Sequence, residues 1–234
     1  MQKVLETNLC IIYYSDSLQK LADATINLLK NKIKQYKIFF GIDLCEKIIV
    51  NYFDNIGDFR KFIYNIRGEK DSLPKYAEGT YDEGMINAYI ESNNQMERIY
   101  TASHELFHIF YLKYVLKNDY SKRIVWYDEG MAQFMSGEKD KYSDKDCFKN
   151  FYLKVKEETK SIPDLNMLEH GESFCNNKYN GYDLSYLCVR YLDYILKPDE
   201  FRLLMSDFSQ IRNYGNKIIY KMFDYFDKMF NINQ

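Results

Sequence analysis

Residues 104–108 read His-Glu-Leu-Phe-His and lie within a predicted helix that follows the capping-box pattern at 92–95 and ends near Lys117. Two histidines four residues apart share one face of a helix, so both imidazoles can reach a single metal ion. Glu105 flanks that face, where its carboxylate is placed to act on a water molecule as a general base. Only 3 histidines occur in the chain, and chance would produce this pattern roughly 0.002 times in a chain of this composition. The pattern predicts a metal site.

A catalytic zinc ion has three protein ligands and one open position, so a third ligand is needed. A histidine six residues beyond His108 would supply it in one class of zinc enzymes, but Tyr114 stands there. The segment Trp126-Tyr-Asp-Glu-Gly-Met-Ala132 offers Glu129 instead, after enough residues for a loop and a returning helix. The competing candidates for the third ligand are Asp128, Cys147 and His170.

The pair of motifs, 104–108 and Trp126-x-x-Glu129-Gly130-x-Ala132, resembles the gluzincin metallopeptidases. These include the thermolysin-like proteases, the zinc aminopeptidases and the peptidase-MA-like domains. The resemblance covers residues 79–196, about half of the chain. It implies that Glu105 activates water and that one Zn²⁺ ion is bound per chain. The metal ligands that it implies are His104, His108 and Glu129.

The same resemblance implies further roles near the metal. Gluzincins stabilise the tetrahedral oxyanion with a tyrosine or histidine of the helical lobe, and Asn180-Gly181-Tyr182 is similar to the start of the helix that carries it. Tyr182 is therefore the candidate donor and Tyr179 the alternative, while packing is the competing interpretation in a chain with 23 tyrosines. Gln133 stands where some gluzincins have an aspartate that orients a zinc histidine.

A predicted hairpin with Gly84 in its turn precedes the metal helix. Gluzincins bind the substrate backbone along an edge strand, and the resemblance assigns that role to residues 85–90; an ordinary sheet edge is the alternative. Zinc aminopeptidases carry Gly-x-Met-Glu-Asn in this region. The sequence here is Gly84-Met85-Ile86-Asn87, which lacks the glutamate that binds the free amine of the substrate in those enzymes. This departure argues against an aminopeptidase and favours an endopeptidase or an unusual hydrolase.

The rest of the chain predicts an α+β fold. Short apolar runs predict strands at 9–14 and 47–53, and amphipathic spacing predicts helices at 18–36, 56–66, 125–135, 183–196 and 215–230. The small Gly130 and Ala132 fit a helix that packs closely against the zinc-binding helix. We expect a zincin-like architecture: a small mixed sheet with helices in residues 1–117, a helical lobe in 118–234, and the metal helix between them, together one catalytic unit.

Composition and charge narrow the possible functions. With 32 Lys+Arg against 34 Asp+Glu, the net charge is -2, which indicates no nucleic-acid or anionic-membrane partner. The 5 cysteines form no C-x-x-C pair, which argues against a disulfide framework or a zinc ribbon. No apolar run approaches the roughly 20 residues of a membrane helix, and no signal peptide is recognisable at the start. The expected location is the cytoplasm.

Taken together, the sequence predicts a zinc-dependent metallopeptidase that hydrolyses a peptide or protein substrate with Glu105 as general base. The alternative is a non-catalytic zinc-binding module that acts through a protein partner. A hydrolase of another bond type is a smaller alternative. The aromatic-rich segment 1–76 resembles no family and is a candidate for substrate specificity.

Overall fold

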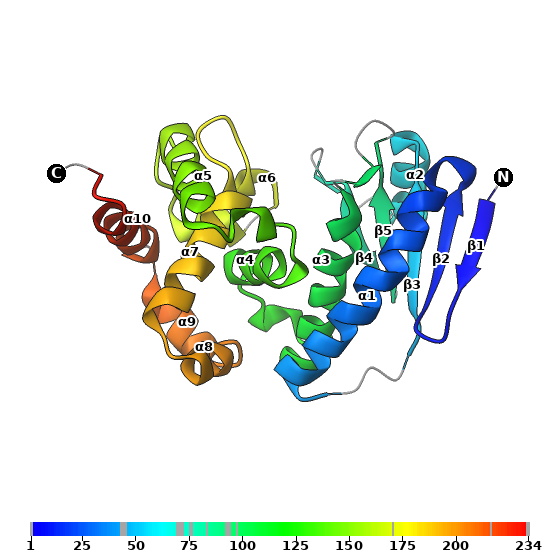
Figure 1. Cartoon of the computed structure of the whole chain (residues 1–234), viewed down its shortest axis with the longest axis horizontal. Coiled ribbons are helices and arrows are strands. Elements are labelled where there is room, and N and C mark those ends of the chain that lie inside the picture. Colours follow the sequence, from blue (N-terminus) through cyan, green and yellow to red (C-terminus); the bar gives the residue numbers. More distant parts are fainter. Residues whose placement is uncertain are drawn as a thin grey trace. The chain divides into compact units, whose positions relative to one another are not determined.

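The computed structural model describes residues 2–42, 46–68, 73–74, 77–82, 84–91, 95–96, 98–169, 171–215 and 217–232. The chain forms two compact units, Met1–Phe110 and Tyr111–Gln234. The first unit contains a sheet and the second is helical, so the α+β class is confirmed (Figure 1). Among the described residues, no helix is both long and apolar enough to cross a bilayer.

The first unit contains a five-stranded mixed sheet in the order β1-β2-β3-β5-β4. The strands β2, β3 and β5 are mutually parallel, while β1 and β4 pair antiparallel to their neighbours. The predicted strands and the hairpin are confirmed, whereas β1 was not predicted. The strand bounds are β1 Gln2–Glu6, β2 Cys10–Ser15, β3 Ile48–Phe53, β4 Gly79–Asp82 and β5 Met85–Tyr89.

The position of β5 corrects the expectation that residues 85–90 form the sheet edge. The strand β5 lies between β3 and β4, so its backbone is paired on both sides. The shorter strand β4 is the last strand at this end of the described sheet. Strand order depends on pairing between distant segments, which the local pattern of a hairpin does not encode.

Helices cover both faces of this sheet. On one face lies α1 (Gln19–Phe40), whose Thr25 hydroxyl is hydrogen-bonded to the Tyr52 hydroxyl of β3 at 2.8 Å. The next residue, Phe53, points to the other face and packs on Phe59 of α2 (Ile56–Arg67). This alternation follows from the two-residue period of a strand. The helix α3 (Ile99–Phe110) packs against α1 and against β4 and β5.

Aromatic packing fixes α3 on α1. The ring of Tyr36 in α1 lies 5.9 Å from Phe107 and 5.5 Å from Phe110, in edge-to-face arrangements that aromatic pairs favour. The buried Tyr36 hydroxyl also donates a hydrogen bond to the Ser103 carbonyl. The capping box predicted for the start of this helix, 92–95, lies mostly outside the described residues.

The second unit begins with a π-helical turn, Tyr111–Val115, which is followed by left-handed backbone at Lys117 and Asn118. The helix that was predicted to end near Lys117 therefore ends at about that residue. Of the helices that follow, α5, α6, α8 and α9 were not predicted. Their bounds are α4 Val125–Ser136, α5 Lys145–Glu158, α6 Gly171–Phe174, α7 Gly181–Ile195, α8 Pro198–Leu204, α9 Phe208–Tyr214 and α10 Lys217–Met229.

The centre of the second unit is α7, which packs against α4, α5, α8 and α10. It approaches α4 closely at Gly130, where an added Cβ would lie 2.5 Å from the Ser185 carbonyl oxygen. Gly130 therefore permits close packing of α4 on α7. The Asn180 side chain caps α7 by accepting from the Tyr182 amide at 3.0 Å.

Candidate metal centre

The helix α3 places the two histidines of the 104–108 motif one turn apart. Their ring centroids are 4.9 Å apart with an interplanar angle of 73°. His104 is partly exposed, and His108 is 6% exposed. The neighbouring Phe107 is fully buried, which fixes the rotation of the helix that presents both imidazoles.

Glu105 lies beside the first residue of β4. Its side chain is 8% exposed, and an added Cβ on Gly79 would lie 2.9 Å from its Oε1 atom and 2.9 Å from Cγ2 of Thr101. Glycine is therefore required at position 79 if Glu105 is to keep this position. The sequence pattern identified Glu105 but gave no sign of this contact, because the two residues are far apart in the chain.

Glu129 lies in the second turn of α4, where it is ion-paired with Arg123. The guanidinium of Arg123 contacts Oδ2 of Asp128 through Nε at 2.5 Å and Oε1 of Glu129 through Nη2 at 2.9 Å. The Asp128 side chain is 0% exposed, the Glu129 side chain 13% and the Arg123 side chain 30%. One cation thus contacts two adjacent carboxylates.

A third carboxylate, that of Glu169, caps the start of α4. Its Oε2 accepts a hydrogen bond from the Val125 amide at 2.9 Å, which satisfies one of the amides left without a partner at a helix start. Burial raises the pKa of Glu169, while the hydrogen bond from Val125 and the nearby charge of Arg123 act against that rise. Neither Arg123 nor Glu169 was predicted as part of the site.

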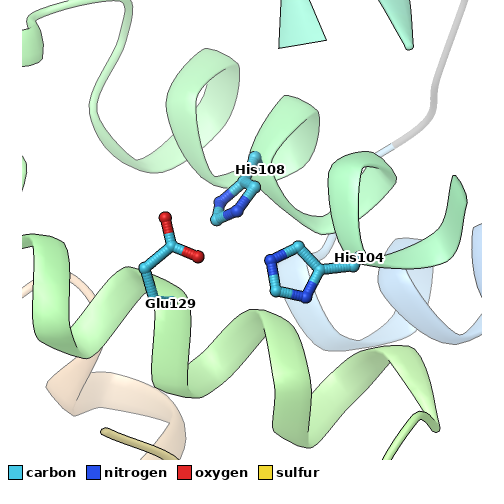
Figure 2. Close-up of side chains that lie close together, drawn as sticks. All are labelled: His104, His108 and Glu129. Atoms are coloured by element: carbon cyan, nitrogen blue, oxygen red, sulfur yellow. The ribbon is translucent and has the colours of Figure 1, made fainter. Parts of the chain in front are cut away.

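Among the described residues, His104, His108 and Glu129 form a group that could hold a metal ion. One candidate ligand atom of each residue lies within 4.8 Å of those of the other two. Figure 2 shows the three side chains directed toward one another. Two imidazole nitrogens and one carboxylate oxygen are a donor set that zinc takes at catalytic sites, so these residues fit a zinc ion.

Of the competing third ligands, Asp128 and Cys147 are not part of this group. Asp128 is fully buried against Arg123, and Cys147 is an exposed residue of the first turn of α5. His170 lies outside the described residues. The donor NH₂ of Gln133 contacts the Tyr182 carbonyl at 2.7 Å, which ties α4 to α7.

The two candidate oxyanion donors differ in their surroundings. Tyr179 is 3% exposed, and its hydroxyl donates a hydrogen bond to the Ser173 carbonyl at 2.7 Å. That hydroxyl is therefore engaged within the protein. Tyr182 is the second residue of α7, and its ring packs edge-on against Phe174 at 4.8 Å. Its hydrogen bond to Gln133 places the Tyr182 backbone beside the turn of α4 that follows Glu129. This favours Tyr182 over Tyr179 as the donor, and its role stays a prediction.

No family model matches the sequence, and no curated protein matches it either. The resemblance to gluzincins is therefore carried by the two motifs alone.

Proposed function

We propose that this chain is a zinc-dependent metallopeptidase of the gluzincin type with a zincin-like fold. His104, His108 and Glu129 hold one Zn²⁺ ion, and Glu105 is the general base. The observation that carries the proposal is the clustering of these two imidazoles and one carboxylate, with candidate ligand atoms within 4.8 Å of one another. The spacing of the two histidines, with Glu105 directly after His104, supports the same chemistry.

A zinc ion at this site would polarise the substrate carbonyl and lower the pKa of water toward about 7. Glu105 accepts the proton of the attacking water and delivers it to the leaving amine. The low exposure of Glu105, 8%, limits competition from bulk water for that proton. The Tyr182 hydroxyl donates a hydrogen bond to the oxyanion as negative charge develops on the carbonyl oxygen.

A peptide substrate suits the sheet edge at β4. The backbone of β4 pairs with β5 on one side, and no further strand pairs with it among the described residues. An extended peptide could add to the other side by main-chain hydrogen bonds. Because Gly79 at the start of β4 touches Glu105, a peptide on this edge would run past the general base. The substrate-binding edge is therefore proposed at Gly79–Asp82 in place of residues 85–90.

The test of the proposal separates metal binding from turnover in one variant. The protein is incubated with a peptide library, cleavage is read by mass spectrometry, and the best substrate is then used for rates. We expect Glu105→Gln to keep the zinc of the wild type and to lose about 10²–10⁴-fold in turnover, because the proton acceptor is gone. Glu157→Gln, at an exposed position of α5, is the matched control and should cleave at the wild-type rate.

Two results would contradict the proposal. If Glu105→Gln cleaved at the wild-type rate, Glu105 would not be the base. If the zinc-loaded wild type cleaved nothing in the library, while Glu105→Gln behaved like wild type in capturing a protein partner, the non-catalytic module would be the better account.

A further inference from the structure

We propose that Arg123 is a positioning residue for the metal ligand Glu129: its guanidinium holds Oε1, so that the carboxylate offers only its other oxygen to the ion. This inference rests on the proposed function, because it concerns the same site. The two motifs contain neither Arg123 nor any sign of how many oxygens of Glu129 bind the metal ion.

The guanidinium of Arg123 contacts two carboxylates through different nitrogens. Arginine presents its N–H donors in a rigid planar fork. Here Nε contacts Oδ2 of Asp128 at 2.5 Å, and Nη2 contacts Oε1 of Glu129 at 2.9 Å. The two contacts use different nitrogens of one plane, so the position of the first carboxylate constrains where the second can be held.

The guanidinium of Arg123 is itself held in place by the buried Asp128. Exposed ion pairs contribute only about 0–1 kcal/mol because both side chains stay mobile. The Asp128 side chain is instead 0% exposed, and a buried carboxylate without its partner would be strongly unfavourable. Asp128 therefore holds Arg123 in place, and Arg123 in turn restricts the carboxylate of Glu129. The 13% exposure of the Glu129 side chain leaves little water to compete for Oε1.

The way Glu129 binds the metal decides whether a coordination position stays open for water and substrate. A carboxylate can bind a cation through one oxygen or through both. If Glu129 used both, it would fill the place that a catalytic zinc site keeps open beside its three protein ligands. With Oε1 held by Arg123, binding of the metal through both oxygens would require that this contact be given up. The positive charge of Arg123 opposes the cation only weakly, because Asp128 offsets it.

The experiment replaces Arg123 and reads the metal directly, without substrate. Zinc affinity is measured by competition with a chromophoric chelator, and coordination is read from the visible absorption of the Co²⁺-substituted protein, which weakens as the coordination number rises. We expect Arg123→Met to weaken zinc binding about 10–100-fold and to reduce the Co²⁺ absorption. Lys156→Met is the matched control, because it breaks the Lys156–Asp227 ion pair at 2.6 Å between α5 and α10, and it should change neither readout.

A second variant guards against loss of folding. Arg123→Lys keeps a cation for the buried Asp128, but a single ammonium lacks the fork that holds two carboxylates at once. We expect this variant to fold and to show the reduced Co²⁺ absorption. Wild-type affinity and absorption in both variants would overturn the inference. So would a weaker affinity with unchanged absorption, because the number of bound oxygens would not depend on Arg123. If the wild type itself bound no metal, the proposed function would fall as well, and that result is distinct from the others.

Discussion

The two helices that carry the candidate ligands are positioned by different kinds of interaction. The helix α3 is fixed by shape: aromatic rings pack it on Tyr36, and the Glu105 side chain fits against a glycine of β4. The helix α4 packs on α7, but charged groups contact its ligand and its start: Arg123 pairs with Glu129, and Glu169 accepts from the Val125 amide. We therefore expect the α3 part of the site to respond most to changes in side-chain size and the α4 part to changes in charge.

Among substitutions that test the role of side-chain size near α3, we expect Gly79→Ala to have the largest effect, a loss of turnover. The added Cβ would lie 2.9 Å from Oε1 of Glu105, which is closer than van der Waals contact allows, so the carboxylate must move. Misplacing a catalytic group by about 1 Å can reduce turnover about 10²-fold, and we expect a loss of that order with unchanged zinc affinity. Steady-state rates and chelator competition measure the two quantities.

The matched control for Gly79→Ala is Gly84→Asn in the turn of the same hairpin. Gly84 has a φ of 82° and nothing within 4 Å of an added Cβ, and asparagine tolerates that backbone conformation. Turnover by Gly84→Asn should stay near the wild-type value. A Gly79→Ala variant as active as wild type would show that size does not control the position of Glu105.

A smaller effect is expected from Gly130→Ala, which tests whether packing also matters for α4. The added Cβ would lie 2.5 Å from the Ser185 carbonyl oxygen, and backbone atoms of α7 cannot move aside as a side chain can. We expect a loss of about 1–3 kcal/mol in the free energy of unfolding, measured in urea. In Gly57→Ala the new Cβ would meet only a side-chain atom, Oδ1 of Asn55 at 3.0 Å, and this control should be less affected. Equal stability of Gly130→Ala and wild type would mean that α4 and α7 can separate freely.

The smallest effect is a pH dependence from Glu169. Burial raises its pKa above the ordinary value of 4.5, so the folded protein holds this proton more tightly than the unfolded chain. The stability that Glu169 contributes is therefore complete below its unfolded pKa and is lost as the pH rises through its folded pKa. Glu169→Gln keeps an oxygen for the Val125 amide but has no charge to titrate. Urea unfolding at several pH values should show wild type losing stability relative to Glu169→Gln as the pH rises; a constant difference would contradict this.

The secondary structure near the site could be predicted because it depends on local periodicity. The strand at residues 9–14 and the helix at 18–36 are found as β2 and α1, within a few residues of the expected ends. The terminal strand β1 was missed, because its five residues show no clear alternation. The order of the strands could not be predicted from the sequence. The strand β5 lies inside the sheet because it pairs with β3, and local patterns do not encode pairing between distant segments.

For the candidate site, the sequence predicted the three side chains that the structure groups together, His104, His108 and Glu129. It missed residues that act through position alone. Arg123 stands before α4 without any periodic pattern, and only the fold shows its guanidinium against two carboxylates. Gly79 is one of 10 glycines, and its contact with Glu105 depends on how β4 meets α3. The contacts of Arg123 and Gly79 depend on how distant segments pack together, which sequence patterns do not specify.

The central claim is that His104, His108 and Glu129 together bind one zinc ion. The most direct measurement is zinc per chain by elemental analysis, after reconstitution and dialysis, for wild type, His104→Ala, His108→Ala and Glu129→Ala. Replacing the remaining histidine, His170→Ala, is the matched control. We expect about one zinc per chain in wild type and in His170→Ala, and loss of that zinc in the other three variants. A wild type without zinc, or full zinc retained in His104→Ala, would contradict this claim.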